Sequence, residues 1–233
     1  MESPVYIKIH NQIKRDIEAG IWKVGDRIPS ERALSVKFDV SRMTLRQALQ
    51  TLVDEGILER RIGAGTYVAR QKVQEKMSGT TSFTEIMRSQ GKFPSSKTIS
   101  YRTVSPSLSE QERLQLGEKD KVVRMERIRL ADGVPISFEV TTIPAALIKD
   151  FSRSEVTDSF YATMEQKGGY RIGRAKQTVM ATLASENIAE HLNIKKGDAI
   201  LRLRQITYLD DERPFEYVRT QYAGERFEFF LEK

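Results

Sequence analysis

Apolar residues recur at steps of three and four along the first part of the chain, the spacing that places side chains on one face of an α-helix. One such face precedes Gly20 and consists of Tyr6, Ile9, Ile13 and Ile17. A short second helix is expected after the cap residue Ser30, with Leu34 and Phe38 on its buried side. A third follows the cap candidate Ser41, and its core-facing stripe consists of Leu45, Ala48, Leu49 and Leu52. The pattern predicts that the last two helices are short and joined by a tight turn.

Beyond Gly56 the pattern changes to short runs of strand-forming residues. The runs "ILERR" and "TYVA" are separated by "IGAG", whose glycines supply the positive φ that a tight hairpin needs. The polar stretch "RQKVQEKMSGTTS" follows and has the composition of a linker. Because 233 residues exceed the common size of one domain, we expect a first domain at 1–70, a linker at 71–79 and a second domain at 80–233.

The second domain mixes strand and helix patterns, which predicts an α+β fold. The runs "SEQERLQL" and "SENIAEHLNI" have the pattern of helices, and "ILRLRQITYLDDERPFEYVRTQY" weakly repeats the hairpin pattern of "VVRMERIRLADGVPISFEVTT". Two such hairpins suggest one antiparallel sheet. In the first hairpin, strict alternation places Arg127 and Arg129 on one strand face. A three-residue loop at 132–134 pairs Arg127 with Glu139 and Arg129 with Ser137, whereas a two-residue loop puts Glu139 on the opposite face.

Composition narrows the classes of protein that remain. With 39% hydrophobic and 30% charged residues and no long apolar run, we expect neither a membrane span nor a signal peptide. The absence of cysteine excludes disulfides, thiolate nucleophiles and thiolate metal sites, and it fits a cytoplasmic protein. A net charge of +6 permits an anionic partner without identifying it.

Arginines gather where the third helix begins, on the side away from its apolar stripe. Arg42 and Arg46 flank Thr44 there, and in a helix-turn-helix protein this turn meets base edges in the major groove. The planar fork of arginine bonds guanine O6 and N7 together, and a helix N-terminus favours phosphate. An ordinary solvated helix face has the same spacing. The adjacent hairpin, with Arg60 and Thr66 beside its glycines, favours the first interpretation, a winged helix-turn-helix that approaches DNA.

The run "PSERALSVKFDVSRMTLRQALQTLVDEGILERRIGAGTYV" resembles the DNA-binding head of the GntR family of bacterial transcription regulators. The shared pattern is P-S-E-R, then V-S-R-x-T-x-R-x-A-L, then E-G and G-x-G-T. Met43 and Ile62 lie where members of the family vary, which implies a role in sequence preference. The resemblance implies DNA contacts by a set of eight residues: Arg32, Ser41, Arg42, Thr44, Arg46, Gly63, Gly65 and Thr66.

Two arginines on one strand face repel each other unless an anion or carboxylates neutralise them. Their fork geometry suits a phosphate. A ladder of salt bridges with Glu126, Glu139 or other acids is the alternative for Arg127 and Arg129.

The second half of the chain resembles the effector-binding UTRA domain of the HutC subfamily, which is related in fold to chorismate lyase. Within that group it is most similar to repressors of N-acetylglucosamine utilisation, on the segments "TSFTEIMRSQGKFPSSK", "RIRLADGVPISFE", "DSFYATMEQ", "GRAKQ" and "PFEYVRTQY". Relatives with the same sheet recognise other ligands, including trehalose phosphate and histidine-pathway acids. The resemblance implies that an amino-sugar phosphate is bound by Phe83, Thr84, Arg127, Arg129, Glu139, Ser159, Tyr161, Glu216 and Tyr222. Of these, the arginines, Ser159 and Thr84 would hold the phosphate.

A lyase-like fold raises the alternative of an enzyme that acts on a small anion. The two histidines, His10 and His191, lie in different predicted domains, so a His-dependent triad or His-rich metal site is not expected. No P-loop or dinucleotide-binding pattern is present. Glu139 and Glu216 are conceivable paired carboxylates, but spacing identifies no general acid. We therefore expect a cytoplasmic repressor without a cofactor, a homodimer whose partners are double-stranded operator DNA and a sugar-phosphate effector.

Overall fold

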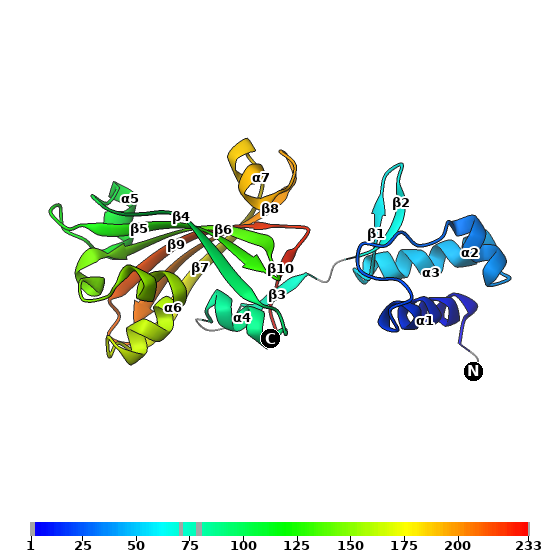
Figure 1. The fold of residues 1–233 in the computed structure, drawn as a ribbon, viewed down its shortest axis with the longest axis horizontal. Coiled ribbons are helices and arrows are strands. Elements are labelled where there is room, and N and C mark those ends of the chain that lie inside the picture. The colour runs from blue at the N-terminus through cyan, green and yellow to red at the C-terminus, as the bar shows by residue number, and fades with distance from the viewer. Residues whose placement is uncertain (1–2, 70–71, 78–80, 233) are drawn as a thin grey trace. The chain divides into compact units, whose positions relative to one another are not determined.

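The computed structural model describes residues 3–69, 72–77 and 81–232 and divides into two compact units, residues 1–71 and 72–233 (Figure 1). We refer to them as the N-terminal and C-terminal units, and each is described by itself. Within the described residues, no helix has both the length and the apolar character needed to cross a membrane.

The N-terminal unit consists of helices followed by a hairpin. Its elements are α1 Val5–Glu18, α2 Glu31–Lys37, α3 Arg42–Asp54, β1 Leu58–Arg61 and β2 Gly65–Val68. The predicted cap residues begin the second and third helices, since Ser30 Oγ accepts from the Ala33 N–H at 3.2 Å and Ser41 Oγ from the Thr44 N–H at 3.1 Å. A serine at this place satisfies a backbone donor that helix geometry leaves free.

One core holds the N-terminal unit together, and it contains the apolar stripes that the spacing predicts. Leu58 and Val68 close it from the hairpin side. Its fully buried members include Ile13, Leu34, Leu45, Ala48 and Leu52. Each large aliphatic side chain buried in this way contributes roughly 1.5–3 kcal/mol to the hydrophobic free energy of folding. Burial of the stripe therefore fixes the rotation of α3 and turns its polar face outward.

The C-terminal unit is built on a six-stranded antiparallel sheet in the order β4-β5-β6-β9-β8-β7. The strands are β4 Pro94–Val104, β5 Val122–Ala131, β6 Val134–Pro144, β7 Ile172–Leu183, β8 Ala199–Leu209 and β9 Pro214–Ala223. The two hairpins that the sequence pattern predicts, β5–β6 and β8–β9, lie side by side because β6 pairs with β9. This confirms the expected α+β class with an antiparallel sheet.

A two-stranded sheet joins the beginning and the end of the C-terminal unit. β3 Val73–Lys76 pairs in parallel with β10 Phe227–Phe230. The sequence places 73–76 in the linker, but Val73 and Glu75 are buried while their neighbours are exposed, which is the period of a strand. The polar composition of the segment concealed this alternation. Residues 70–71 and 78–80 of the same segment lie outside the described residues.

The β5–β6 turn decides which charged residues share a face. Asp132 and Gly133 form a two-residue turn with φ of 51° and 76°, values that favour glycine or a short polar residue. A β-bulge at the start of β6 then adds one residue. Arg127 therefore pairs with Glu139, and both share their sheet face with Arg129. The molecule combines a two-residue turn with the register expected of a longer loop.

Helices cover both faces of the large sheet (Figure 1). α4 Phe83–Ser89 and α6 Arg153–Gln166 pack on the face that carries the arginine pair, and α5 Leu108–Leu114 and α7 Glu186–Leu192 pack on the other. A 3-10 turn, η1 Ala145–Ile148, follows β6. The face under α4 and α6 is the one that holds the pocket described below, and we call it the inner face.

Candidate functional site

The polar side of α3 is accessible to solvent. Arg42 and Arg46 are exposed and Thr44 is half-buried, whereas the apolar stripe on the opposite side is buried. Ser41 Oγ lies 2.9 Å from Thr44 Oγ1, which holds this hydroxyl pair at the first turn. The first turns of α3 therefore present two guanidinium groups and two hydroxyls on a rigid helix. Arg32, the predicted contact on α2, is also exposed.

A carboxylate that sequence reasoning did not single out lies between α3 and the hairpin. Glu31 Oε2 accepts hydrogen bonds from Arg46 Nε at 3.2 Å and Nη2 at 3.0 Å. Glu31 Oε1 lies 3.6 Å from Arg60 Nη2. One side chain of α2 thus positions an arginine of α3 and an arginine of β1. Glu31 was visible in the P-S-E-R pattern, but its partners come from other elements.

The tip of the hairpin requires glycine. Gly63 has a φ of 73° and Gly65 a φ of 118°. A Cβ on Gly65 would lie 2.8 Å from Arg27 Nε, so a side chain there meets backbone strain and requires the flexible Arg27 side chain to shift. Thr66 follows on β2, half-buried, and Ile62 stands fully exposed beside the tip. The eight predicted DNA contacts therefore all lie in the N-terminal unit, on α2, at the start of α3 and on the hairpin.

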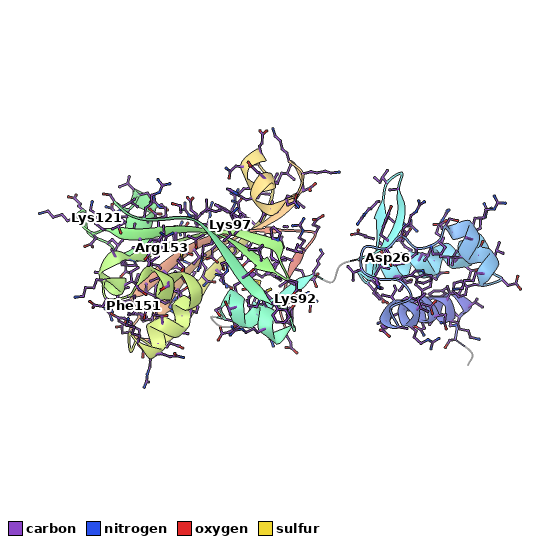
Figure 2. All side chains as sticks on the ribbon, viewed as in Figure 1. Asp26, Lys92, Lys97, Lys121, Phe151 and Arg153 are labelled. Carbon is purple, nitrogen blue, oxygen red and sulfur yellow. The ribbon has the colours of Figure 1, made fainter. Side chains whose placement is uncertain are left out.

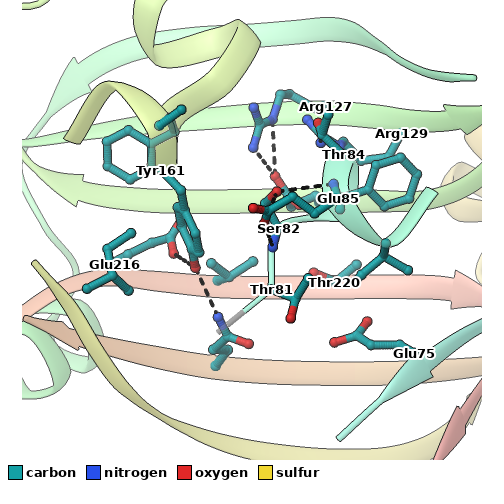
Figure 3. Close-up of a pocket in the computed structure, with 18 of the residues that line it drawn as sticks. Glu75, Thr81, Ser82, Thr84, Glu85, Arg127, Arg129, Tyr161, Glu216 and Thr220 are labelled. Atoms are coloured by element: carbon teal, nitrogen blue, oxygen red, sulfur yellow. Dashed lines mark hydrogen bonds and ion pairs between the residues drawn. The ribbon is translucent and has the colours of Figure 1, made fainter. Parts of the chain in front are cut away.

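The C-terminal unit contains a cavity of about 370 Å³ between the inner face of the sheet, α4 and α6 (Figure 3). Eight of the nine predicted effector residues line it: Phe83, Thr84, Arg127, Arg129, Glu139, Tyr161, Glu216 and Tyr222. The ninth, Ser159, belongs to α6, but its side chain lies outside the described ones. Residues from eight elements line the cavity, and strand alternation directs every second side chain of β5, β6, β8 and β9 toward it.

Arg127 is the most tightly held cation of the pocket. It donates from Nε to Glu139 Oε1 at 3.1 Å, from Nη2 to the same oxygen, and from Nη1 to the Thr157 carbonyl at 2.9 Å. Thr141 donates to Glu139 as well, at 3.0 Å. Burial alone raises the pKa of Glu139, but the charges of Arg127 and Arg129 outweigh it and lower that pKa to about 2. The carboxylate is therefore ionised and neutralises one of the two arginines.

Arg129 has fewer partners among the described residues. Its Nη2 donates to Thr84 Oγ1 at 3.4 Å, and its guanidinium lies 4.6 Å from the centroid of the Phe83 ring. Its Nε is buried and has no hydrogen-bond partner within the described part of the chain. Burial, together with the charge of Arg127, lowers the pKa of Arg129 to about 10. A buried guanidinium whose N–H group has no partner is destabilising, and an anion bound beside it would remove that cost.

The other end of the cavity holds a hydrogen-bonded network around Glu216. Tyr161 donates to Glu216 Oε2 at 2.8 Å, and Thr207 donates to the same oxygen at 3.2 Å. Gln205 donates to Thr207 at 2.9 Å. Burial raises the pKa of Glu216 to about 7, although the hydrogen bond from Tyr161 acts in the opposite direction. This end can donate and accept hydrogen bonds with a polar ligand.

Tyr222 and Glu75 form the link between the pocket and β3. The Tyr222 hydroxyl donates to Glu75 Oε2 at 3.4 Å, and both residues line the cavity. Burial raises the pKa of Glu75 to about 7, while the hydrogen bond from Tyr222 lowers it. Sequence reasoning missed Glu75 because the segment around it was assigned to a linker, and its partner lies 147 residues away.

The groups that line the cavity suit a small polar ligand. Within the described residues there is no group of three or more His, Asp or Glu side chains arranged to hold a metal ion. The cavity has a cationic part at Arg127 and Arg129 and hydrogen-bonding groups at Tyr161 and Glu216 (Figure 3). It can accommodate a small molecule with an anionic group at one end and hydroxyl or amide groups at the other.

Each of the two units matches a known protein family. The model of the UTRA domain matches residues 89–228, and the model of bacterial regulatory proteins of the gntR family matches residues 5–68. The chain is 35% identical over 226 residues to the HTH-type transcriptional repressor NagR of Bacillus subtilis (strain 168), covering 97% of this chain and 93% of that protein. It is 32% identical over 228 residues to the mannosyl-D-glycerate transport/metabolism system repressor MngR of Escherichia coli (strain K12), covering 98% and 95%.

Solved structures of other proteins also resemble this chain. PhnF from Mycobacterium smegmatis aligns with a TM-score of 0.73 at 27% identity, covering 96% of this chain and 98% of that one. A GntR-family transcriptional regulator from Enterococcus faecalis V583 aligns with a TM-score of 0.58 at 59% identity, covering 60% of this chain and 100% of that one. The likeness to PhnF therefore extends over both units.

Proposed function

The chain belongs to the GntR family of bacterial regulatory proteins and carries a UTRA domain, and from this premise we propose that it is a cytoplasmic repressor that leaves its operator when a phosphorylated amino sugar fills the pocket. The family is one of transcription regulators, not of enzymes. NagR and MngR, two relatives that align over nearly the whole chain, are both named as repressors.

The DNA contacts proposed are those of the exposed N-terminal turns of α3 and of the hairpin. Arg42 and Arg46 read base edges in the major groove, and the glycine tip lets the hairpin backbone approach the neighbouring groove or phosphates. Arg42→Ala should reduce operator affinity by about 1–3 kcal/mol, the value of one bidentate arginine–guanine contact. Lys14→Ala, at an exposed position of α1 outside the predicted contacts, removes the same charge and serves as the control.

The observation that carries the effector proposal is the buried arginine pair with one ionised carboxylate beside it. Glu139 neutralises one positive charge, and the other guanidinium, Arg129, keeps a buried N–H without a partner among the described residues. A phosphate monoester supplies both the missing charge and oxygen acceptors in the geometry of a guanidinium fork. Thr84 adds a hydroxyl to the same end of the cavity.

The sugar part of the effector then extends from the arginine pair toward Tyr161 and Glu216. Tyr222 lies across Ser137 from Arg129, on the other side of the pair. The carboxylate and phenol groups at these positions accept and donate hydrogen bonds to hydroxyl and acetamido groups. The cavity volume of about 370 Å³ lies near the lower end of the range common for small-molecule sites. We therefore assign N-acetylglucosamine 6-phosphate or glucosamine 6-phosphate as the effector.

Thermal unfolding with four candidate ligands tests this assignment. The ligands are N-acetylglucosamine 6-phosphate, glucosamine 6-phosphate, unphosphorylated N-acetylglucosamine and inorganic phosphate. A ligand specific to the folded state adds RT ln(1 + [L]/Kd), about 2.7 kcal/mol at a hundredfold excess over Kd. Stabilisation by the sugar phosphates that is lost in Arg129→Gln supports the proposal. Equal stabilisation by unphosphorylated N-acetylglucosamine contradicts the phosphate role of the arginines.

A second candidate effector is a sugar carboxylic acid, because the relative MngR is named for mannosyl-D-glycerate. A carboxylate also fits an arginine fork. Adding mannosyl-D-glycerate to the same series distinguishes the two, since it stabilises the protein only if the cationic end accepts a carboxylate.

Release from DNA is proposed to follow from linkage within a homodimer. Two N-terminal units on a two-fold operator require a half-site spacing set by the C-terminal units, and the effector shifts that preference. By thermodynamic reciprocity, operator DNA must weaken effector binding by the factor with which the effector weakens DNA binding. A titration that finds no mutual effect refutes this mechanism. Sedimentation at working concentration tests the dimer directly.

A further inference from the structure

The face of the large sheet opposite the effector pocket carries a second concentration of arginines. A hollow of about 640 Å³ on this outer face is lined by Ser107, Glu110, Arg124, Glu126, Val140, Arg202, Arg204, Arg219 and Gln221. The lining holds four guanidinium groups against two carboxylates. We call it the outer groove. Nothing in the proposed function uses it, because the effector pocket lies on the inner face.

Strand register brings two of these cations directly opposite each other. Arg204 of β8 pairs with Arg219 of β9, and Arg202 lies two residues further along the same strand face. Side chains directly opposite in an antiparallel pair have Cβ atoms about 5 Å apart, and like charges there are destabilising. A sequence that keeps three arginines at such positions bears a cost in stability unless something neutralises them.

The two carboxylates of the lining neutralise them only in part. Glu126 forms no ion pair with another described residue, and Glu110 reaches only Arg219 of the three. Glu110 is nearly fully buried and is occupied by Arg124 at 2.5 Å, Thr142 at 3.0 Å and the Ser107 amide at 2.8 Å, with Arg219 at 3.5 Å. Burial raises the pKa of Glu110, but its hydrogen bonds, led by Arg124, lower it to about 2, so it holds a single fixed negative charge.

The outer groove has hydrogen-bond donors without partners and a polar lining. Arg219 Nε is buried without a hydrogen-bond partner among the described residues. Arg202 and Arg204 are half-buried, and the guanidinium of each forms no hydrogen bond or ion pair with another described residue. Val140 is the single apolar residue of the lining, so the groove suits a polar occupant.

We propose that the outer groove is a second ligand site, which binds the diphosphate group of a small metabolite through Arg202, Arg204 and Arg219. Two adjacent phosphates match several guanidinium groups on neighbouring strands better than one phosphate does, because each fork can take its own pair of oxygens. The site is separate from the effector pocket, since alternation along β8 and β9 directs its side chains to the opposite face of the sheet.

The test is isothermal titration calorimetry, in which inorganic pyrophosphate is added to the full chain at low salt. The background is Arg129→Gln, so that the cationic end of the effector pocket does not contribute. Adding Arg202→Gln and Arg204→Gln should reduce pyrophosphate affinity at least tenfold. Adding Lys97→Gln should leave it within twofold, because Lys97 lies on the edge strand β4, exposed and outside the groove (Figure 2). Equal affinity in the two sets of variants overturns the proposal.

A second measurement does not depend on the ligand. Without anion and at low salt, Arg204→Gln should raise the unfolding temperature relative to Lys97→Gln, because it removes the repulsion from Arg219. If instead the arginine variants shift the sedimentation coefficient and leave pyrophosphate affinity unchanged, the groove is a contact between copies of the chain. If the arginine variants lower only the non-specific affinity for duplex DNA, the groove binds the phosphate backbone of a nucleic acid. Either result overturns the small-ligand site.

Discussion

Glu139→Gln is the substitution that most directly probes how the effector pocket holds its charge. The change keeps the size of the side chain but removes the negative charge that faces two arginines, which are 6% and 5% exposed. Arg127 loses an ion pair that involves both its Nε and its Nη2. Removing one partner of a buried ion pair costs roughly 3–5 kcal/mol, because the remaining charge is left uncompensated.

The loss of stability in Glu139→Gln should appear as a lower unfolding temperature, and binding of an anion should restore part of it. For a unit of this size, roughly 3–5 kcal/mol corresponds to a fall of about 6–20 °C in Tm. Phosphate or a sugar phosphate then supplies the missing charge, so the ligand should raise the Tm of the variant by more than it raises that of the wild type.

Differential scanning calorimetry with and without glucosamine 6-phosphate measures both effects. Glu112→Gln on the exposed side of α5 removes the same charge away from the pocket and should change Tm by little. Two outcomes refute the reasoning: a variant as stable as the wild type without ligand, or a ligand-induced rise no larger than that of the wild type.

Four further predictions rest on single contacts. Ser41→Ala should destabilise α3 by about 1 kcal/mol and accelerate hydrogen exchange of the Thr44 amide, which donates to Ser41 Oγ. Gly65→Ala should lower the stability of the N-terminal unit by about 1–3 kcal/mol in chemical denaturation, because an alanine is strained at a φ of 118°. Glu31→Gln should weaken operator binding in a gel-shift assay, since Arg46 and Arg60 lose the carboxylate that positions them, whereas Glu18→Gln, exposed at the end of α1, should not. Burial raises the pKa of Glu216 to about 7 from an ordinary value of 4.5, so its contribution to stability is fully present below pH 4.5 and is lost as pH rises through 7. The free energy of unfolding of the wild type, relative to that of Glu216→Gln, should therefore fall between pH 5 and pH 8. A difference that stays constant over this range contradicts the raised pKa.

The sequence predicts the N-terminal unit well because its information is local. Helix period, serine caps and hairpin glycines each lie within a few residues of the feature they determine, and the structure places all of them as expected. The same kind of signal was present for α6 and was not used. Ser152 and Glu155 form a capping box, and Val156, Phe160 and Met164 follow at steps of four.

The pocket was predictable in its residues but not in its internal contacts. Alternation assigned Arg127 and Arg129 to one face, yet the position of Glu139 depended on a β-bulge that leaves no clear mark in the sequence. Glu31 and Glu75 were missed for a related reason. Their partners come from other elements, and a carboxylate in a polar stretch gives no sign of being buried.

The parallel pairing of β3 with β10 has a consequence for protein engineering. These strands are the first and last of the C-terminal unit, and they run side by side over four residue pairs. The entry and exit points of the unit are therefore separated by about one short strand, roughly 14 Å. A module whose two ends lie this close can be spliced into a surface loop of another protein without stretching the host chain.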